Sequence, residues 1–169
     1  VVIEKNKAIT GGGIYVNGNC EIKHCEIAYN FASTSGGGIF SSAPTSISYS
    51  KIRNNYAMTS EEIGGPLNNK GRGAGFYFQG KGDVIDVGPE FEMSYTDVTG
   101  NACMYYGGGG QVCNGAIFTM NEGTNINNNT SVLHGAGGLH LTGSAHLILD
   151  AGEICDNTAH SVGGAIHSS

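Results

Sequence analysis

The sequence predicts an all-β fold, a right-handed parallel β-helix of about six coils with three short parallel sheets. Three observations favour this solenoid. An aliphatic residue is followed three positions later by asparagine and two positions after that by a small residue, and this element occurs six times along the 169 residues. A glycine-rich segment that ends in an apolar residue follows each copy. Most copies recur at intervals in the twenties, a repeat length typical of solenoids.

The two halves of the repeat can be aligned along the whole chain. The asparagine elements are Ile3/Asn6/Ala8, Ile27/Asn30/Ala32, Ile52/Asn55/Ala57, Val98/Asn101/Cys103, Ile126/Asn129/Ser131 and Ile154/Asn157/Ala159. The glycine segments are GGGI (11–14), GGGI (36–39), GAGF (73–76), GGQV (109–112), AGGL (136–139) and GGAI (163–166). Because one coil cannot bury its apolar face alone, stacked neighbours must supply the core. A leucine-rich repeat would require Leu-x-Leu before the asparagine, where this sequence has small or polar residues.

The coils differ in length. Successive aliphatic positions are 24, 25, 46, 28 and 28 residues apart. The first two coils (1–19 and 20–44) are short and regular, with short strand-forming runs between glycine and asparagine clusters. The third (45–83) contains the insertion AMTSEEIGGPLNNKGR, the fourth (84–116) adds VIDVGPEFEM, and the last two (117–169) are regular again. Neither end has the polar cap of a complete solenoid, so we expect residues 1–169 to be one segment of a longer β-helix.

The asparagine column predicts an internal ladder of amides. Asparagine tolerates tight turn dihedrals, and its amide both donates and accepts hydrogen bonds. Stacked coils place equivalent residues about 4.8 Å apart, close enough for these amides to bond one another. We therefore expect a structural role for Asn6, Asn30, Asn55, Asn101, Asn129 and Asn157.

Composition and charge limit the partners. Glycine accounts for 29 residues and proline for 3, and the apolar fraction of 39% can sustain a core. Lysine and arginine number 8 against 14 acidic residues, and the net charge of −6 argues against a nucleic-acid partner. The segment has no apolar run long enough to span a membrane, so the sequence predicts no membrane insertion by it. All the basic residues precede position 82, so the two halves carry opposite net charges, and this asymmetry predicts salt-dependent head-to-tail self-association.

The repeat resembles that of the polymorphic outer-membrane protein family, defined by FxxN and GGAI elements in surface-exposed right-handed β-helices. GGAI stands at 163–166, whereas the FxxN element is present only as Ile/Val-x-x-Asn. The resemblance extends to the wider pectin-lyase-like folds, and it implies an extracellular or cell-surface location. Members of this class are adhesins, passenger domains and polysaccharide-cleaving enzymes. The resemblance implies a non-catalytic structural or adhesin-like module, for which membership of an extracellular assembly is one option. Its alternative is a polysaccharide lyase or glycoside hydrolase with its site in the two insertions.

One outward column is predicted to carry aromatic residues that could stack on sugars or contact a protein. It follows the apolar end of each glycine segment and contains Tyr15, Phe40, Tyr77, Cys113, His140 and His167. The alternative is that these rings stack on one another or pack against a flanking loop. A two-histidine metal site is a further option for His140 and His167, although no carboxylate or cysteine completes it.

The acidic residues suggest calcium more than catalysis. Oxygen ligands for a structural Ca²⁺ could come from Asp83, Asp86, Glu90 and Glu92. The alternative is a solvated acidic loop, with no cofactor at all. In the columns on either side of the aliphatic position, acids alternate with bases or amides. No carboxylate pair stands on adjacent coils, as a retaining glycosidase requires, so the sequence predicts no catalytic residue.

The insertions are the preferred place for a ligand, a glycan or a host or neighbouring protein. Loops on a rigid scaffold usually carry recognition, and residues 58–72 and 80–92 would form a ledge containing Glu61, Glu62 and Arg72 beside an exposed Tyr77. The alternative is that coil three merely tolerates long loops, because lengthening a loop costs little entropy. Asn128 begins an Asn-Asn-Thr glycosylation sequon.

The five cysteines leave several readings open. Cys103 aligns with small residues and should be buried, whereas Cys113 and Cys155 are expected at the surface. The composition allows one or two disulfides of undefined connectivity.

Overall fold

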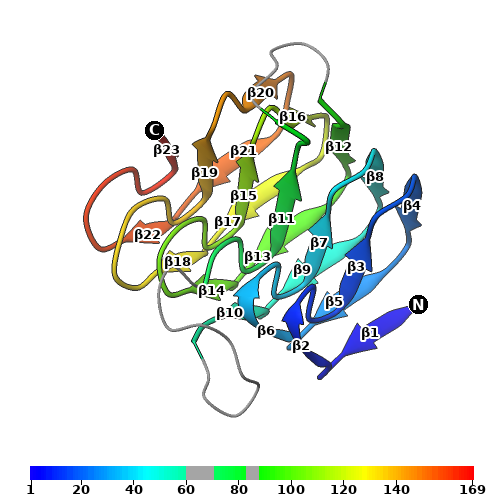
Figure 1. The fold of residues 1–169 in the computed structure, drawn as a ribbon, viewed down its shortest axis with the longest axis horizontal. Helices are drawn as coiled ribbons and strands as arrows, with labels where there is room; N and C mark the ends of the chain where they lie inside the picture. The colour runs from blue at the N-terminus through cyan, green and yellow to red at the C-terminus, as the bar shows by residue number, and fades with distance from the viewer. Residues whose placement is uncertain (60–70, 83–87) are drawn as a thin grey trace.

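The chain folds as a parallel β-solenoid, as the repeat predicts. The computed structural model describes residues 1–59, 71–82 and 88–169. The described residues contain strands and turns without a helix, and each strand pairs in parallel with the equivalent strand of the neighbouring coil. The coils follow one another along the long axis from the N-terminus to the C-terminus (Figure 1).

The strands form four sheets, called sheets I to IV in the order in which the chain visits them. Sheet I contains β1 (Val2–Glu4), β5 (Glu26–Ala28), β9 (Lys51–Arg53), β13 (Asp97–Thr99), β17 (Asn125–Asn127) and β21 (Glu153–Cys155). Sheet II contains β2 (Lys7–Thr10), β6 (Phe31–Ser35), β10 (Tyr56–Ala57), β14 (Ala102–Cys103), β18 (Thr130–Ser131) and β22 (Thr158–Ala159). Sheet III contains β3 (Ile14–Val16), β7 (Ile39–Ser41), β11 (Phe76–Gln79), β15 (Gly110–Cys113), β19 (Leu139–Thr142) and β23 (Ile166–Ser168). Sheet IV contains β4 (Cys20–Lys23), β8 (Thr45–Ser48), β12 (Glu90–Ser94), β16 (Ile117–Met120) and β20 (His146–Leu149).

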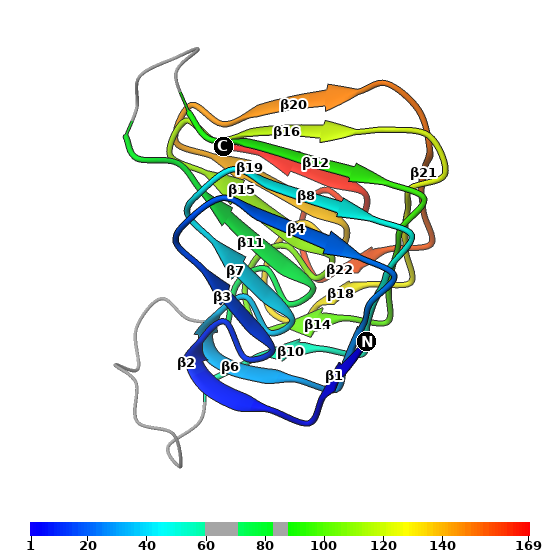
Figure 2. The ribbon, with the colours of Figure 1, turned by 90° about the vertical axis from the view of Figure 1, so that its right-hand side faces the viewer.

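The fold class is confirmed, but the number of sheets exceeds the predicted three. The strand after each glycine segment and the strand before each asparagine element belong to separate sheets, because a turn such as 17–19 lies between them. Viewed from the N-terminal side, the chain therefore winds around four sides (Figure 2).

The stacking register is continuous across the 46-residue interval. Lys51 of β9 pairs with Asp97 of β13 in the same way that Glu26 pairs with Lys51 one coil earlier. The column of strands is therefore unbroken between coils three and four.

The asparagines form one hydrogen-bonded ladder through the interior. At each of the five steps, the side-chain nitrogen donates to the side-chain oxygen of the next asparagine at 3.0 Å, and that oxygen also accepts the backbone N–H of the donor residue. From Asn30 onward, the second amide hydrogen reaches the backbone carbonyl of an aliphatic residue one coil earlier, as from Asn30 to Ile3 at 2.9 Å. The four central asparagines are fully buried. The ladder thus satisfies buried amides that would otherwise destabilise the core.

The core changes character along the axis. The inner face of sheet I carries a buried aliphatic column of Ile27, Ile52, Val98 and Ile126. The middle coils add a cluster of four buried phenylalanines, Phe76, Phe78, Phe91 and Phe118, in which the Phe78 and Phe91 rings stack at 4.3 Å.

Coil four has a different register from the one expected. Gly110, rather than Val112, pairs with Phe76 and Leu139. A Cβ atom on Gly110 would come within 2.2 Å of the Phe76 ring, so this ring occupies the space that a side chain would fill. The residue that follows the anchor is therefore Gln111, and Cys113 instead pairs with residues two positions farther along the neighbouring strands.

Candidate functional site

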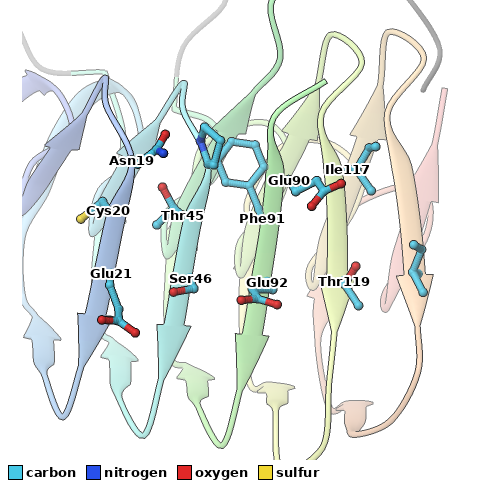
Figure 3. Close-up of a pocket in the computed structure, with 12 residues that line it drawn as sticks. Asn19, Cys20, Glu21, Thr45, Ser46, Glu90, Phe91, Glu92, Ile117 and Thr119 are labelled. Carbon is cyan, nitrogen blue, oxygen red and sulfur yellow. The ribbon is translucent and has the colours of Figure 1, made fainter. Parts of the chain in front are cut away.

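A groove of about 660 Å³ crosses the outer face of sheet IV. All five strands of the sheet contribute to it, so it runs across the coils rather than along one strand (Figure 3). Its lining residues are Asn19, Cys20, Glu21, Pro44, Thr45, Ser46, Glu90, Phe91, Glu92, Ile117, Thr119 and Ile148.

Strand alternation places the groove side chains. In β12, Phe91 and Met93 are buried while Glu90 and Glu92 are exposed. The parallel register then sets one outward residue from each coil side by side, in the order Glu21, Ser46, Glu92, Thr119 and Ile148. A second outward position adds Glu90 beside Ile117.

The groove is acidic and partly apolar. Among the described residues that line it, three are glutamates and none is basic. At one end Glu21 forms a surface ion pair of 2.5 Å with Lys23, and the hydrogen bond and charge of Glu21 raise the pKa of Lys23. Pro44, Ile117 and Ile148 supply apolar surface between the polar groups. Such a lining can exchange hydrogen bonds with hydroxyl groups and contact C–H surfaces at the same time.

The predicted calcium ligands are only partly placed. Glu90 and Glu92 lie on β12 and point outward, whereas Asp83 and Asp86 lie outside the described residues. Among the residues that the structure describes, no group of three or more histidine, cysteine, aspartate or glutamate side chains could hold a metal ion.

The predicted ligand ledge is also only partly placed. Glu61 and Glu62 are outside the described residues. Arg72 pairs in single bridges with Ser35 and Tyr106, and its guanidinium lies 5.7 Å from the Tyr106 ring. Arg72 also interacts with the Tyr77 hydroxyl. The structure therefore brings Arg72 and Tyr77 together.

The expectation of an exposed Tyr77 is wrong. Tyr15, Phe40 and Tyr77 stack along sheet III at 4.9 and 5.5 Å, but only Tyr15 is open to solvent, at 57% exposure, and the other two are 8% and 9% exposed. The Cys113 thiol, which is also buried rather than at the surface, donates to the Tyr77 hydroxyl at 3.3 Å. Burial raises the pKa of Tyr77. The rings stack on one another, so they offer little free face to a ligand.

Histidines continue the outer column of sheet III at its C-terminal end. The His140 and His167 rings lie 5.2 Å apart, and Tyr106 stacks on His140 at 4.5 Å. Burial, together with the nearby His167 and Arg72, lowers the pKa of His140 to about 4. His140 is thus a neutral, buried packing residue at ordinary pH.

The remaining site residues can be placed simply. Asn128 is exposed and its neighbour Asn129 is turned into the ladder, so Asn128 is the accessible asparagine of the two. All five cysteines lie in the described part of the chain and none is in a disulfide. Cys155 is exposed and Cys103 is buried, as expected.

Two surface features of the structure were not predicted from the sequence. The first feature is the groove, which depends on Glu21, Ser46 and Thr119. The alternation of inward and outward residues in the short strands could have indicated that these three side chains point outward. The second feature is an exposed stack of His24, Tyr49 and Tyr95 beside sheet IV. Its signal is the Ser-Tyr-Ser/Thr sequence at 48–50 and 94–96.

No family model, curated protein or solved structure matches this chain. No helix in the described part of the chain is long and apolar enough to cross a membrane.

Proposed function

We propose that this chain is a non-catalytic, secreted or cell-surface module of adhesin type, and that it binds a neutral glycan chain in the sheet IV groove. The observation that carries the proposal is the groove itself, which is open to solvent and spans every strand of one sheet. The backbone beneath it is fixed by parallel pairing on both sides of each inner strand, so the binding groups are positioned before a ligand arrives.

The direction of the groove favours an extended ligand. Equivalent side chains of successive coils repeat about every 4.8 Å, and five coils contribute to the lining. A chain of similar units lying along the solenoid axis would therefore meet Glu21, Ser46, Glu92 and Thr119 in turn. Carboxylates and hydroxyls can bond its hydroxyl groups, and Ile117 and Ile148 can contact its ring C–H surfaces.

The charge of the groove selects among glycans. The described lining residues include three glutamates and none that is basic, a charge that would repel a uronic-acid or sialylated chain. We therefore expect neutral glycans to bind and polyuronides to be rejected.

Substitution of the groove centre tests this proposal. Thr119→Arg places a long side chain between Glu92 and Ile148, and we expect it to weaken glycan binding at least about 10-fold, equivalent to about 1.4 kcal/mol. The matched control is Thr158→Arg on β22, an exposed threonine of sheet II, which should leave affinity unchanged. Titration calorimetry against a panel of neutral and acidic glycans provides the measurement. Binding that survives Thr119→Arg, or a panel without any neutral ligand, would contradict the proposal.

A carbohydrate-active enzyme is the second candidate, and one observation favours it. Glu90 and Glu92 are exposed on the same face of β12, and residues two apart in a strand have Cα atoms about 6.6 Å apart. The carboxyl groups of inverting glycosidases are about 6.5–9.5 Å apart, a separation that two flexible glutamate side chains on Cα atoms at this spacing can reach. New reducing ends or unsaturated products on incubation with the same panel, abolished by Glu90→Gln, would favour the enzyme over the adhesin.

A further inference from the structure

The exposed stack beside sheet IV contains two tyrosines from adjacent coils. Tyr49 and Tyr95 are 46 positions apart in sequence, but their rings lie 4.9 Å apart with only 1° between the ring planes. Tyr49 is 55% exposed and Tyr95 is 44% exposed. His24 extends the stack on the other side of Tyr49, at 5.2 Å.

The backbone holds these rings at some cost. Tyr49 and Tyr95 have φ angles of 49° and 46°, the left-handed region that side chains other than glycine, asparagine and aspartate rarely adopt. His24, at the same corner one coil earlier, has a φ of 50°, so the left-handed turn belongs to this corner of the solenoid. Parallel pairing imposes it here, because the Tyr49 N–H bonds Ser94 and the Tyr95 N–H bonds Glu122.

Tyr95 also has a proton acceptor. Its hydroxyl donates to the Glu122 carboxylate at 2.8 Å. A phenol loses an electron more readily when a base can take its proton in the same step. Tyr95 is therefore the tyrosine best prepared for one-electron oxidation, and Tyr49 is in contact with it.

We propose that Tyr49 and Tyr95 are a dityrosine modification site, cross-linked by a haem peroxidase with hydrogen peroxide. Each phenol gives up one electron and its hydroxyl proton, and the two radicals join through ring carbons ortho to the oxygens. The hydrogens on the joined carbons then move to the oxygens and restore both phenols. The pair has lost two electrons and two protons, and these convert one hydrogen peroxide into two waters. The product is a covalent link between coil three and coil four, and it does not depend on ligand binding in the groove.

The chain supplies an internal control. Tyr15 is at least as exposed and is stacked just as closely, at 4.9 Å, but its neighbour is Phe40, which has no hydroxyl group. Tyr77, the other phenol of that stack, lies beyond Phe40, so a radical on Tyr15 has no phenol in contact with it. Among the stacked rings of the described residues, the Tyr49–Tyr95 contact is the one that joins two phenols.

The test is oxidation of the dilute protein with haem peroxidase and hydrogen peroxide. We expect dityrosine fluorescence, an intact monomer that has lost two hydrogen atoms, and a cross-linked peptide that joins positions 49 and 95. Tyr49→Phe and Tyr95→Phe should each abolish this product, while the phenyl ring preserves the stack and the fold. Tyr15→Phe should leave the yield unchanged, and Glu122→Gln should slow the reaction.

Two outcomes would overturn the proposal. One is a fluorescent product that persists in Tyr49→Phe or Tyr95→Phe. The other is a product found only as dimers whose yield rises with protein concentration. Thermal melting supplies an independent readout, since a link that closes a 46-residue interval should raise the Tm of the oxidised wild type by about 5–10 °C and leave that of oxidised Tyr95→Phe unchanged.

Discussion

At the residue scale, the stacking of identical side chains has opposite consequences for asparagine and histidine. An asparagine amide both donates and accepts, so a column of them satisfies itself through the bonds seen from Asn6 to Asn157. Histidine rings stack well only while they are neutral, because two protonated rings at 5.2 Å repel each other. The outer histidine column should therefore make the solenoid sensitive to acid, whereas the asparagine ladder should not.

His140 provides the measurable form of this difference. Its folded pKa of about 4 lies below the ordinary value of 6.5, so the unfolded chain binds the proton first as the pH falls. The stability associated with neutral His140 is complete above about pH 6.5 and is lost as the pH falls toward 4. His167 and Arg72 both oppose its protonation. We expect the free energy of unfolding of His140→Gln, followed by urea denaturation, to fall less over this window than that of the wild type.

The matched control for that experiment is His146→Gln, which replaces an exposed histidine of β20. It should retain the pH dependence of the wild type. If the free energy of unfolding of His140→Gln falls with pH as steeply as that of the wild type, the buried His140 does not cause the acid sensitivity.

At the scale of elements, neighbouring strands compensate for one another's volume. Phe76 of β11 is fully buried, stacks on Phe78 at 4.5 Å and fills the space left by Gly110 of β15. This exchange of a large residue for a small one across coils shifts the register of coil four by two positions from the one that the sequence suggested. The run GGGGQV (107–112) can be aligned with the neighbouring coils through either Gly110 or Val112. The volume of Phe76 on the adjacent coil decides between these two alignments.

Gly110→Ala tests this compensation. The new methyl group would meet the Phe76 ring, which its packed neighbours hold in place, and we expect a loss of about 1–3 kcal/mol in the free energy of unfolding. Phe76→Leu should relieve the clash, so that the double variant is more stable than the two single losses predict, by about 0.5 kcal/mol or more. Gly18→Ala, where a Cβ meets nothing within 4 Å, should change stability little. Additive losses in a denaturation cycle would rule out the proposed contact.

At the scale of the molecule, the sequence predicted the parallel solenoid, the stacked coils and the ladder, because each depends on a pattern that repeats within one coil. It offered the stacking of Tyr15, Phe40 and Tyr77 on one another as an alternative, but it expected Tyr77 to be exposed, since an outward position in a strand does not reveal the neighbours that cover it. It did not predict the groove, whose members come from five coils and repeat no residue type. Such surfaces depend on alignment between coils, which a single repeat does not encode.

That alignment is the central claim, since it sets Ser46 beside Glu92 despite the insertions between them. Disulfide formation between Ser46→Cys and Glu92→Cys, with Cys20, Cys25 and Cys155 replaced by serine, tests it most directly. Adjacent parallel strands place the two Cα atoms about 4.8 Å apart, within the roughly 4.4–6.8 Å that a disulfide spans. The control pair is Glu21→Cys with Glu92→Cys. These positions are two strands apart, so the distance between their Cα atoms exceeds that range. We predict rapid oxidation of the first pair and none of the second; equal cross-linking of both pairs, or cross-linking of the second alone, would contradict the stacked register.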